Sequence, residues 1–427
     1  MRTKSLLFTL AGACALPFCA SAQASDVQIY GTFLPFLDHI KTSGATAKGL
    51  SPATGGATQV PDTAYTGDLG NLPARNRITS GTSNLGFRGS FKVNEDLKVI
   101  WQIESAISPD GDAPNSLTSR NSCVGLAGAW GTVFYGNWDT PYKYPILFVG
   151  ALRGLNPFDN ALTANPGFNV PGTTTQSGRA NAKADAAFNR RQGNSVQYWS
   201  PDLNGFSGRV AYSVNEGKTQ PTATVPSISP DLWSVLLSYK AGPFNISYGF
   251  EQHNDYFGLA QLGGSAGATA TNTGSKDVGH ELVAAYAFST GTKVSAIVER
   301  LSYDTDDTAV GKVNHYERDA WYLLVQQRWG THQLFGAYGK ANAGSAKIVG
   351  GGPVTTNGLG GAQWSAGYVY SLAKSADLYT SVYGMTNERS ASYALFPPVG
   401  SGVAPGASTT GFGLGILYTF LPRRRHE

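Results

Sequence analysis

Alternating apolar and polar positions dominate the chain after its first 25 residues. In segment 84–93, the apolar side chains Leu85, Phe87, Phe91 and Val93 share one face, and mostly polar or small residues occupy the other. The same two-residue period recurs in 97–105, 233–240, 244–251 and 411–420. Because successive side chains of a β-strand point to opposite faces, this pattern predicts strands of about ten residues with one apolar face.

The links between these segments differ in length in a regular way. Seven are short: 93–96, 128–131, 201–205, 240–243, 289–292, 329–332 and 372–376. Eight are long and polar or rich in glycine: 39–76, 106–119, 139–194, 214–230, 254–276, 304–318, 340–362 and 388–408. Long and short links that alternate along the chain predict an all-β membrane protein, a 16-stranded antiparallel transmembrane β-barrel, with fourteen or eighteen strands as alternatives. A soluble β-sandwich gives no reason for this alternation.

Closure explains why a membrane protein would take this form. In lipid every backbone N–H and C=O group needs a partner, and only a closed sheet has no edge. Several aromatic residues lie near the ends of the predicted strands, as interfacial girdles require. They are Trp101, Tyr239, Phe244, Phe288, Trp321, Trp329, Phe335 and Phe420. The alternative is that these residues form the core of a sandwich.

The two ends of the chain carry features outside the barrel pattern. Basic Arg2 and Lys4, an apolar stretch at 6–18 and the small residues around 22–24 predict a signal peptide over residues 1–24. A lipoprotein signal at one of the early cysteines is a weaker alternative. The barrel is then expected over 25–420, and the basic tail 421–427 follows Phe420 as a tolerated extension or as a hindrance to assembly.

Composition narrows the class of protein further. Charged residues make up only 14% of the chain, and 53 of its 427 residues are glycine. Both values disfavour a helical bundle and a soluble α/β enzyme, since ordinary soluble domains are about 25% charged and about 7% glycine. The formal net charge is +4, and removing Arg2 and Lys4 with the signal lowers it to +2. A nearly neutral chain is not expected to bind nucleic acid, and Cys123, the one cysteine left, forms no internal disulfide.

Four stretches of the mature chain resemble the general porins of the Gram-negative outer membrane, of the β-proteobacterial type. They are VQIYG at 27–31, SNLGFRG at 83–89 with EDL at 95–97, RNSCVGL at 120–126 with GTV at 131–133, and NSVQY at 194–198 with SP at 200–201 and GFS at 205–207. The likeness is strongest over 25–215. It rests on the order and spacing of the stretches together.

The resemblance implies a homotrimer of barrels in the outer membrane, each crossing it many times, with a third outer loop that folds inward and narrows the pore. The longest link, 139–194, occupies that place and contains the apolar run 145–152. A loop lying outside the barrel is the alternative. The implied partners are outer-membrane lipid, lipopolysaccharide, the assembly machinery, and small hydrophilic solutes and ions. No cofactor or metal is expected.

Charged residues are expected around the narrowest part of the pore. Arg120 and Arg191 match arginines that the family places on the wall facing the third loop, whereas Asn84 occupies the third such position. With residues assigned to the lumen by alternation or to the loop by position, the candidate site comprises Asn84, Arg88, Lys98, Glu104, Arg120, Asp139, Arg153, Asp159, Lys183, Asp185, Arg190, Arg191 and Arg209. Facing charges set ion preference, and the excess of cations predicts a weak preference for anions. The alternative is that these charges pair and only hold the loop.

Passive diffusion of ions and small solutes is the function that this pattern favours. A substrate-specific channel is the nearest alternative, and an aromatic track along the lumen would mark it. A membrane enzyme or an adhesin is the alternative of another class, but no G-x-S-x-G motif is present and the histidines are scattered, most of them in predicted links or tails. The acidic run 304–307 fits a solvated loop tip or a divalent-ion site.

Overall fold

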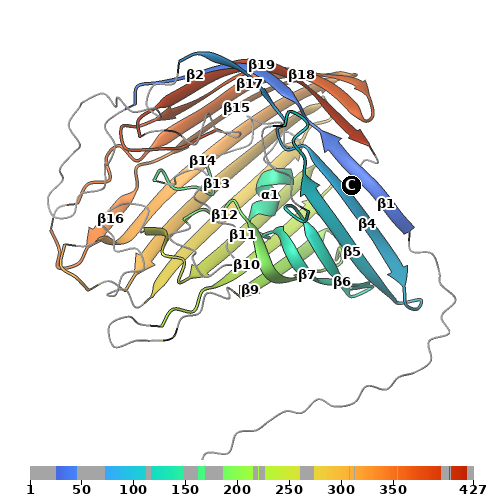
Figure 1. Ribbon diagram of the computed structural model, residues 1–427, viewed down its shortest axis with the longest axis horizontal. Helices are drawn as coiled ribbons and strands as arrows, with labels where there is room; N and C mark the ends of the chain where they lie inside the picture. The colour runs from blue at the N-terminus through green and yellow to red at the C-terminus, as the bar shows by residue number, and fades with distance from the viewer. Residues whose placement is uncertain are drawn as a thin grey trace, which may run out of the picture.

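The protein forms one antiparallel sheet that closes on itself (Figure 1). The computed structural model describes residues 26–45, 73–111, 117–148, 162–168, 186–214, 220, 227–259, 274–306, 308–311, 313–352, 354–395, 403 and 405–420. The expected signal peptide and the basic tail lie outside these residues.

The strands follow one another around the barrel in nearly sequential order. The first ten are β1 (Asp26–Phe33), β2 (Phe36–Ser43), β3 (Arg75–Thr79), β4 (Asn84–Lys92), β5 (Leu97–Ala106), β6 (Ser122–Gly128), β7 (Gly131–Asp139), β8 (Arg191–Trp199), β9 (Phe206–Val214) and β10 (Asp231–Ala241). The others are β11 (Phe244–Asn254), β12 (Ser275–Ala287), β13 (Thr292–Thr305), β14 (Val313–Trp329), β15 (His332–Ala341), β16 (Ser345–Ile348), β17 (Gly361–Ala373), β18 (Ala376–Asn387) and β19 (Ser408–Phe420). A short helix, α1 (Lys143–Phe148), lies inside the barrel.

Three pairs of consecutive labelled strands are each the two halves of one longer strand with a local break. β1 and β2 are separated at Leu34 and Pro35, and both pair with β19, through Gly31 opposite Phe420 and Phe36 opposite Gly415. Pro35 lacks the N–H that would continue the ladder. β3 with β4, and β15 with β16, are interrupted in the same way. The described residues therefore form sixteen strands, and the pairing of the first with the last closes the barrel, which confirms the predicted architecture.

Short and long links alternate as predicted. Seven short links, such as 93–96 and 242–243, gather at one end of the barrel, and eight longer ones gather at the other. The boundaries differ from the prediction by a few residues, and the third long link covers 140–190. Among the described residues, no helix is long and apolar enough to cross a membrane.

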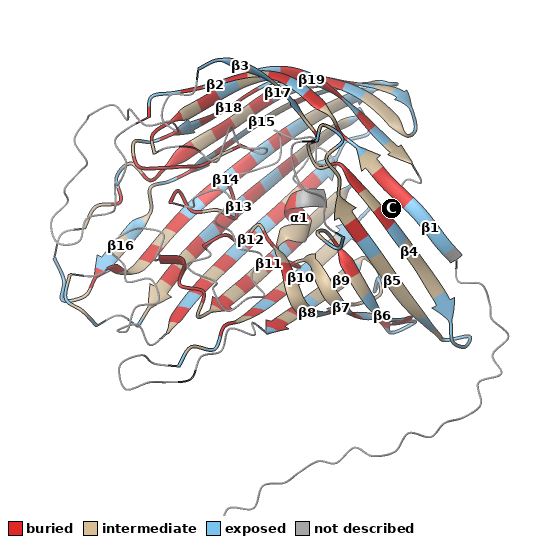
Figure 2. Ribbon diagram, viewed as in Figure 1, coloured by how far each residue is buried: buried red, intermediate tan, exposed pale blue. Residues whose placement is uncertain are grey.

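Side chains alternate between the two faces of the wall, which Figure 2 shows as bands of buried and exposed residues along the strands. Leu237, Phe412 and Leu414 on the outer face are 57–59% exposed, whereas Ser234 and Gln197 on the inner face are almost fully buried. An apolar exterior around a polar interior is the reverse of a soluble protein. It suits a barrel surrounded by lipid.

Two expectations about single residues are wrong. Phe335 is only 5% exposed and faces inward, because its neighbour Leu334 takes the outward position in β15. The prediction that most histidines lie in links or tails is also wrong. It failed because the sequence pattern assigned the polar ends of β11 to β15 to links. Five of the six occupy strands: His39, His253, His280, His315 and His332.

Candidate functional site

The described parts of the third long link, 140–148, 162–168 and 186–190, contact the inner wall of β10 to β14. Glu299 of β13 accepts hydrogen bonds from the Tyr142 hydroxyl at 2.7 Å and from the Ala164 backbone N–H at 2.6 Å. Burial, with Glu299 next to it, raises the pKa of Tyr142 well above its usual value, so its phenol stays protonated and acts as a donor. Glu299 thus holds two points of the link that are far apart in sequence.

Arg318 of β14 completes this attachment. Its guanidinium lies 2.9 Å from Glu299 and donates hydrogen bonds to the carbonyl oxygens of Leu162 and Asn165, at 3.2 and 2.5 Å. Arg318 and Glu299 are 1% and 4% exposed. A buried ion pair is favourable only when hydrogen bonds satisfy its remaining groups. The link satisfies part of them, while the Arg318 Nε makes no hydrogen bond to the described residues.

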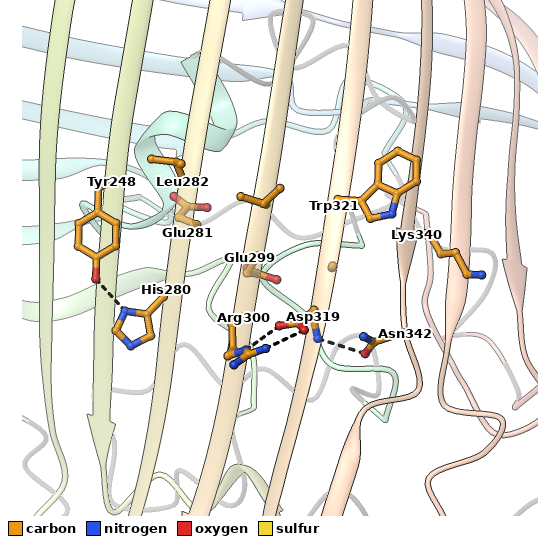
Figure 3. A pocket seen from close by; sticks show the side chains of 12 residues that line it. Tyr248, His280, Glu281, Leu282, Glu299, Arg300, Asp319, Trp321, Lys340 and Asn342 are labelled. Carbon is orange, nitrogen blue, oxygen red and sulfur yellow. Dashed lines mark hydrogen bonds and ion pairs between the residues drawn. The ribbon is translucent and has the colours of Figure 1, made fainter.

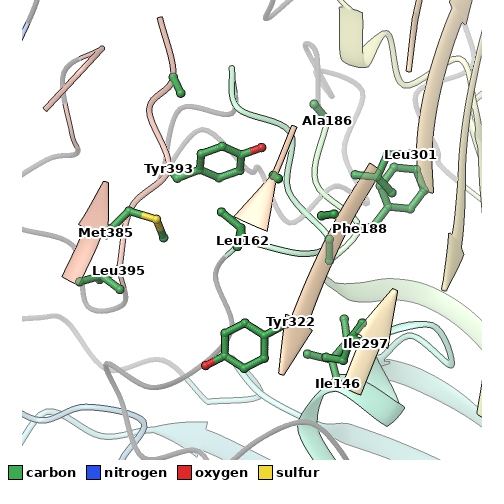
Figure 4. Close-up of a cluster of buried hydrophobic side chains, with 14 of the residues drawn as sticks. Ile146, Leu162, Ala186, Phe188, Ile297, Leu301, Tyr322, Met385, Tyr393 and Leu395 are labelled. Atoms are coloured by element: carbon green, nitrogen blue, oxygen red, sulfur yellow. The ribbon is translucent and has the colours of Figure 1, made fainter. Parts of the chain in front are cut away.

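Apolar packing accompanies these polar contacts (Figure 4). Ile146 of α1, Leu162 and Phe188 belong to one buried cluster with wall residues such as Ile297 and Tyr322. The cluster accounts for Ile146 in the apolar run 145–152, whose last four residues lie outside the described part of the chain.

A second carboxylate lies beside Glu299 on the wall. Glu281 of β12 is directly opposite Glu299 in the ladder, is 1% exposed, and makes no hydrogen bond to the described residues. The Glu251 carboxylate of β11 lies 2.9 Å from the His253 Nε2, and both residues are fully buried. These three glutamates therefore lie within the wall region that the third link covers.

Glu104 and Arg120 form a pair on another part of the wall, at β5. The Arg120 Nε lies 2.7 Å from one carboxylate oxygen of Glu104, and the Tyr30 hydroxyl donates to the other at 2.8 Å. Glu104 is fully buried, but the Arg120 side chain is 23% exposed. Arg120 therefore presents the accessible part of the pair.

Asp139, at the end of β7, collects three donors from different elements. Lys143 of α1 and Arg191 of β8 lie 3.1 and 3.2 Å from its Oδ1, and Asn121 donates to its Oδ2 at 2.8 Å. Arg191 also donates to Asn121 at 2.5 Å. Burial lowers the pKa of Lys143, although Asp139 opposes this shift. Two cations share one carboxylate here, so the group carries a net positive charge.

Two further arginines, one on the inner wall and one at the end of the third link, contact aromatic rings. The Arg209 guanidinium of β9 lies 3.4 Å from the centre of the Tyr144 ring and 3.9 Å from that of Trp199. Arg190 lies 4.8 Å from the ring centre of Tyr256. Such contacts hold a cation in place without neutralising it.

The other predicted site residues are distributed as follows. Arg88 donates to Gln28 at 3.1 Å and lies over the Tyr30 ring, and Asn84 donates to the Thr82 carbonyl. Lys98 is exposed near the short-link end of β5. Arg153, Asp159, Lys183 and Asp185 lie outside the described residues.

Sequence reasoning missed the residues that attach the link to the wall: Tyr142, Glu281, Glu299 and Arg318. Strand alternation places Glu281, Glu299 and Arg318 on the inner face, which is a signal that the sequence contains. Nothing local indicates their partner, since Tyr142 and Glu299 are 157 positions apart.

A hollow on the barrel also lies away from the lumen (Figure 3). Its lining includes outward-facing Leu282, Val298 and Trp321, which are 42–52% exposed. Beside them Arg300 pairs with Asp319 at 2.7 Å. The hollow belongs to the outer wall, where apolar residues give way to charged ones toward the long-link end.

The fold and the site define a transmembrane β-barrel with a charged interior. Residues 9–390 match the family described as Gram-negative porin, and the chain belongs to this family. It is 28% identical over 300 residues to the major outer membrane protein P.IA of Neisseria meningitidis serogroup A, an alignment covering 64% of this chain and 69% of that protein.

Solved structures agree with the fold. The anion-selective porin from Comamonas acidovorans matches with a TM-score of 0.66 at 18% identity, over 93% of this chain and all of that one. The in-vitro folded OmpT of Vibrio cholerae, in its trimer form, matches with a TM-score of 0.55 at 14% identity over the same shares. The chain is thus an outer-membrane porin of a Gram-negative bacterium.

Proposed function

We propose that the protein is a passive channel in which the third link forms the constriction, and that the channel weakly prefers anions. It does no bond chemistry. The observation that carries the proposal is the separation of charge on the inner wall. Arg120, Lys143, Arg191 and Arg209 are partly exposed on the side of β5 to β9, with Glu104 and Asp139 as the carboxylates among them.

The acidic groups of the opposite wall are covered. Glu251, Glu281 and Glu299 are at most 4% exposed, and the third link lies against this region. An ion in the lumen is therefore closer to accessible cations than to accessible carboxylates, and rings of charge set ion preference.

Single-channel recording of the purified protein in a planar bilayer tests this function. We expect conductance in groups of three equal steps, and a reversal potential under a KCl gradient whose sign indicates chloride preference. Folded protein that never conducts would refute the channel. A cation-selective potential would refute the assigned preference.

We propose further that the chain assembles as a homotrimer, after removal of residues 1–24, with the assembly machinery of the outer membrane. The family assignment and the trimer form of the Vibrio cholerae barrel support the assembly. Mass spectrometry of the native complex and of its N-terminal peptide tests both points: a monomer, or a chain that retains residues 1–24, would contradict them.

We also propose that outward-facing Arg300 and Lys340 lie at the level of the lipid headgroups, where lipopolysaccharide phosphates would contact them. Both line the outer hollow beside its apolar residues. Lipopolysaccharide retained after detergent extraction should fall in a double variant with glutamine at both positions. Unchanged retention would exclude these contacts.

A further inference from the structure

Arg209 occupies an unusual position for a cation on the wall of a channel. Its guanidinium is 3.4 Å from the ring centre of Tyr144 and 3.9 Å from that of Trp199, and the two ring centres are 6.4 Å apart. The guanidinium therefore lies between the rings. We call these three residues the aromatic clamp.

The two ring planes are inclined by 60°, so the guanidinium can stack on only one of them, and the Tyr144 hydroxyl lies close to part of its edge. All five N–H donors of arginine lie in the plane of the group, and Arg209 remains partly exposed. Within the described part of the chain, no carboxylate forms an ion pair with it, in contrast to Arg120 and Arg191. A planar edge with parallel donors matches the two oxygens of a carboxylate.

The surroundings of the clamp are aromatic. Trp138 lies 5.7 Å from Trp199 and 5.1 Å from Phe134 between ring centres, and the three rings form one group on the lumen side of β7 and β8. Trp138, Trp199 and Tyr144 are each partly exposed. Apolar ring surface beside a water-filled passage is covered favourably by another ring.

The clamp also lies on the route of a solute. Tyr144 comes from α1 in the third link, next to Lys143 and its partner Asp139. Trp199 ends β8 at the short-link side of the barrel, and Arg209 follows just after the next turn. The clamp therefore lies next to the charged group around Asp139 on the lumen side of the wall.

We propose that the aromatic clamp and Trp138 form a binding subsite in the pore for solutes that combine a carboxylate with an aromatic ring. The carboxylate binds the edge of Arg209, and the ring packs beside Trp138 and Trp199. This proposal rests on the proposed channel function and names a class of solute for it.

The test is block of the KCl current of the full-length channel by benzoate. Acetate carries the same charge without the ring, and benzamide carries the ring without the charge. We expect benzoate to halve the current at a concentration at least about tenfold below that of either. Equal block by benzoate and acetate, with the wild-type channel conducting, would overturn the proposal and leave the channel function intact.

Variants assign the effect to the subsite. Arg209→Gln should raise the half-blocking concentration of benzoate about tenfold or more, and Trp138→Leu should reduce the advantage of benzoate over acetate without affecting acetate. Arg328→Gln is the matched control, because Arg328 is exposed near a short link and forms no aromatic clamp. Its block should equal that of the wild type.

Arg209 could instead only attach α1 to the wall, and the variants separate the two roles. Attachment alone predicts altered KCl conductance in Arg209→Gln with unchanged benzoate block, which would overturn the proposal. Should a variant not conduct, quenching of tryptophan fluorescence by benzoate in detergent solution measures binding directly. Wild-type quenching that Arg209→Gln does not weaken would also overturn it.

Discussion

Replacing Tyr142 with phenylalanine should loosen the third link without changing its packing. The variant keeps the buried ring and removes the hydroxyl that donates to Glu299 at 2.7 Å. Glu299 keeps Arg318 and the Ala164 N–H, so it does not become an isolated charge. A hydrogen bond to a charged group contributes about 1.5–3 kcal/mol, and we expect the local opening free energy of the link to fall by that amount.

Hydrogen exchange of the Ala164 amide measures this quantity directly. This N–H bonds the same carboxylate oxygen as Tyr142, so it exchanges when the link leaves the wall. A loss of about 1.5–3 kcal/mol corresponds to exchange roughly 10- to 100-fold faster. Open-channel current noise should rise with it.

Tyr316→Phe is the control. Tyr316 is also fully buried, but its hydroxyl donates to the Ala343 carbonyl, between β15 and β16, and not to the link. Ala164 exchange should be unchanged in this variant. Equal exchange in the wild type and in Tyr142→Phe would refute Glu299 as the attachment point, and equal acceleration in both variants would indicate a general loss of barrel stability.

Three further predictions concern charge and packing. Asp139→Asn should raise the chloride-to-potassium permeability ratio about two- to fivefold, since a unit charge about 4 Å away in water contributes about 1 kcal/mol; an unchanged reversal potential would contradict it. Because burial lowers the pKa of Lys143, it should lose its proton as pH rises toward the ordinary value of about 10.4. At pH values below that ordinary value, anion preference should therefore already decrease in the wild type but not in Lys143→Gln. Loss of the proton also removes the free-energy cost of burying the charged Lys143 ammonium, so the stability of the folded protein should rise over the same pH range. Gly125→Ala should destabilise the barrel by about 1–3 kcal/mol, because a Cβ there would collide with the Val133 carbonyl and Phe134, whereas Gly336→Ala meets open space; the temperature at which the folded band disappears on a gel compares the two.

The barrel could be predicted because its signal is local. The two-residue period in 244–251 and 411–420 appears in the structure as β11 and β19, with the expected residues facing outward. Strand number followed from the alternation of link lengths. The interruption at Leu34 and Pro35 was not predicted. The flanking strands β1 and β2 run in the same direction and both pair with β19, so the break does not change the order of the strands.

The partners of charged residues could not be predicted, because they depend on which strands become neighbours. Glu104 and Arg120 meet since β5 and β6 pair, and their separation in sequence is small. Glu299 meets Tyr142 only after the link turns back into the barrel. Sequence placed Arg209 on the inner face, but its clamp requires Tyr144 from the link and Trp199 from β8.

Attachment of the link and the charge of the lumen are two consequences of one arrangement. The carboxylates that hold the link must be buried to bind its N–H and O–H groups strongly, because water would otherwise compete for them. Burial in turn removes Glu299 and its neighbour Glu281 from the surface that ions encounter. The cations opposite them are less completely covered, since the Arg120, Lys143 and Arg191 side chains are 23%, 16% and 11% exposed, and Asp139 neutralises only one of Lys143 and Arg191. In the channel that we propose, buried acids that hold the third link on one wall leave a positive lumen on the other, and losing the attachment should change selectivity as well as noise.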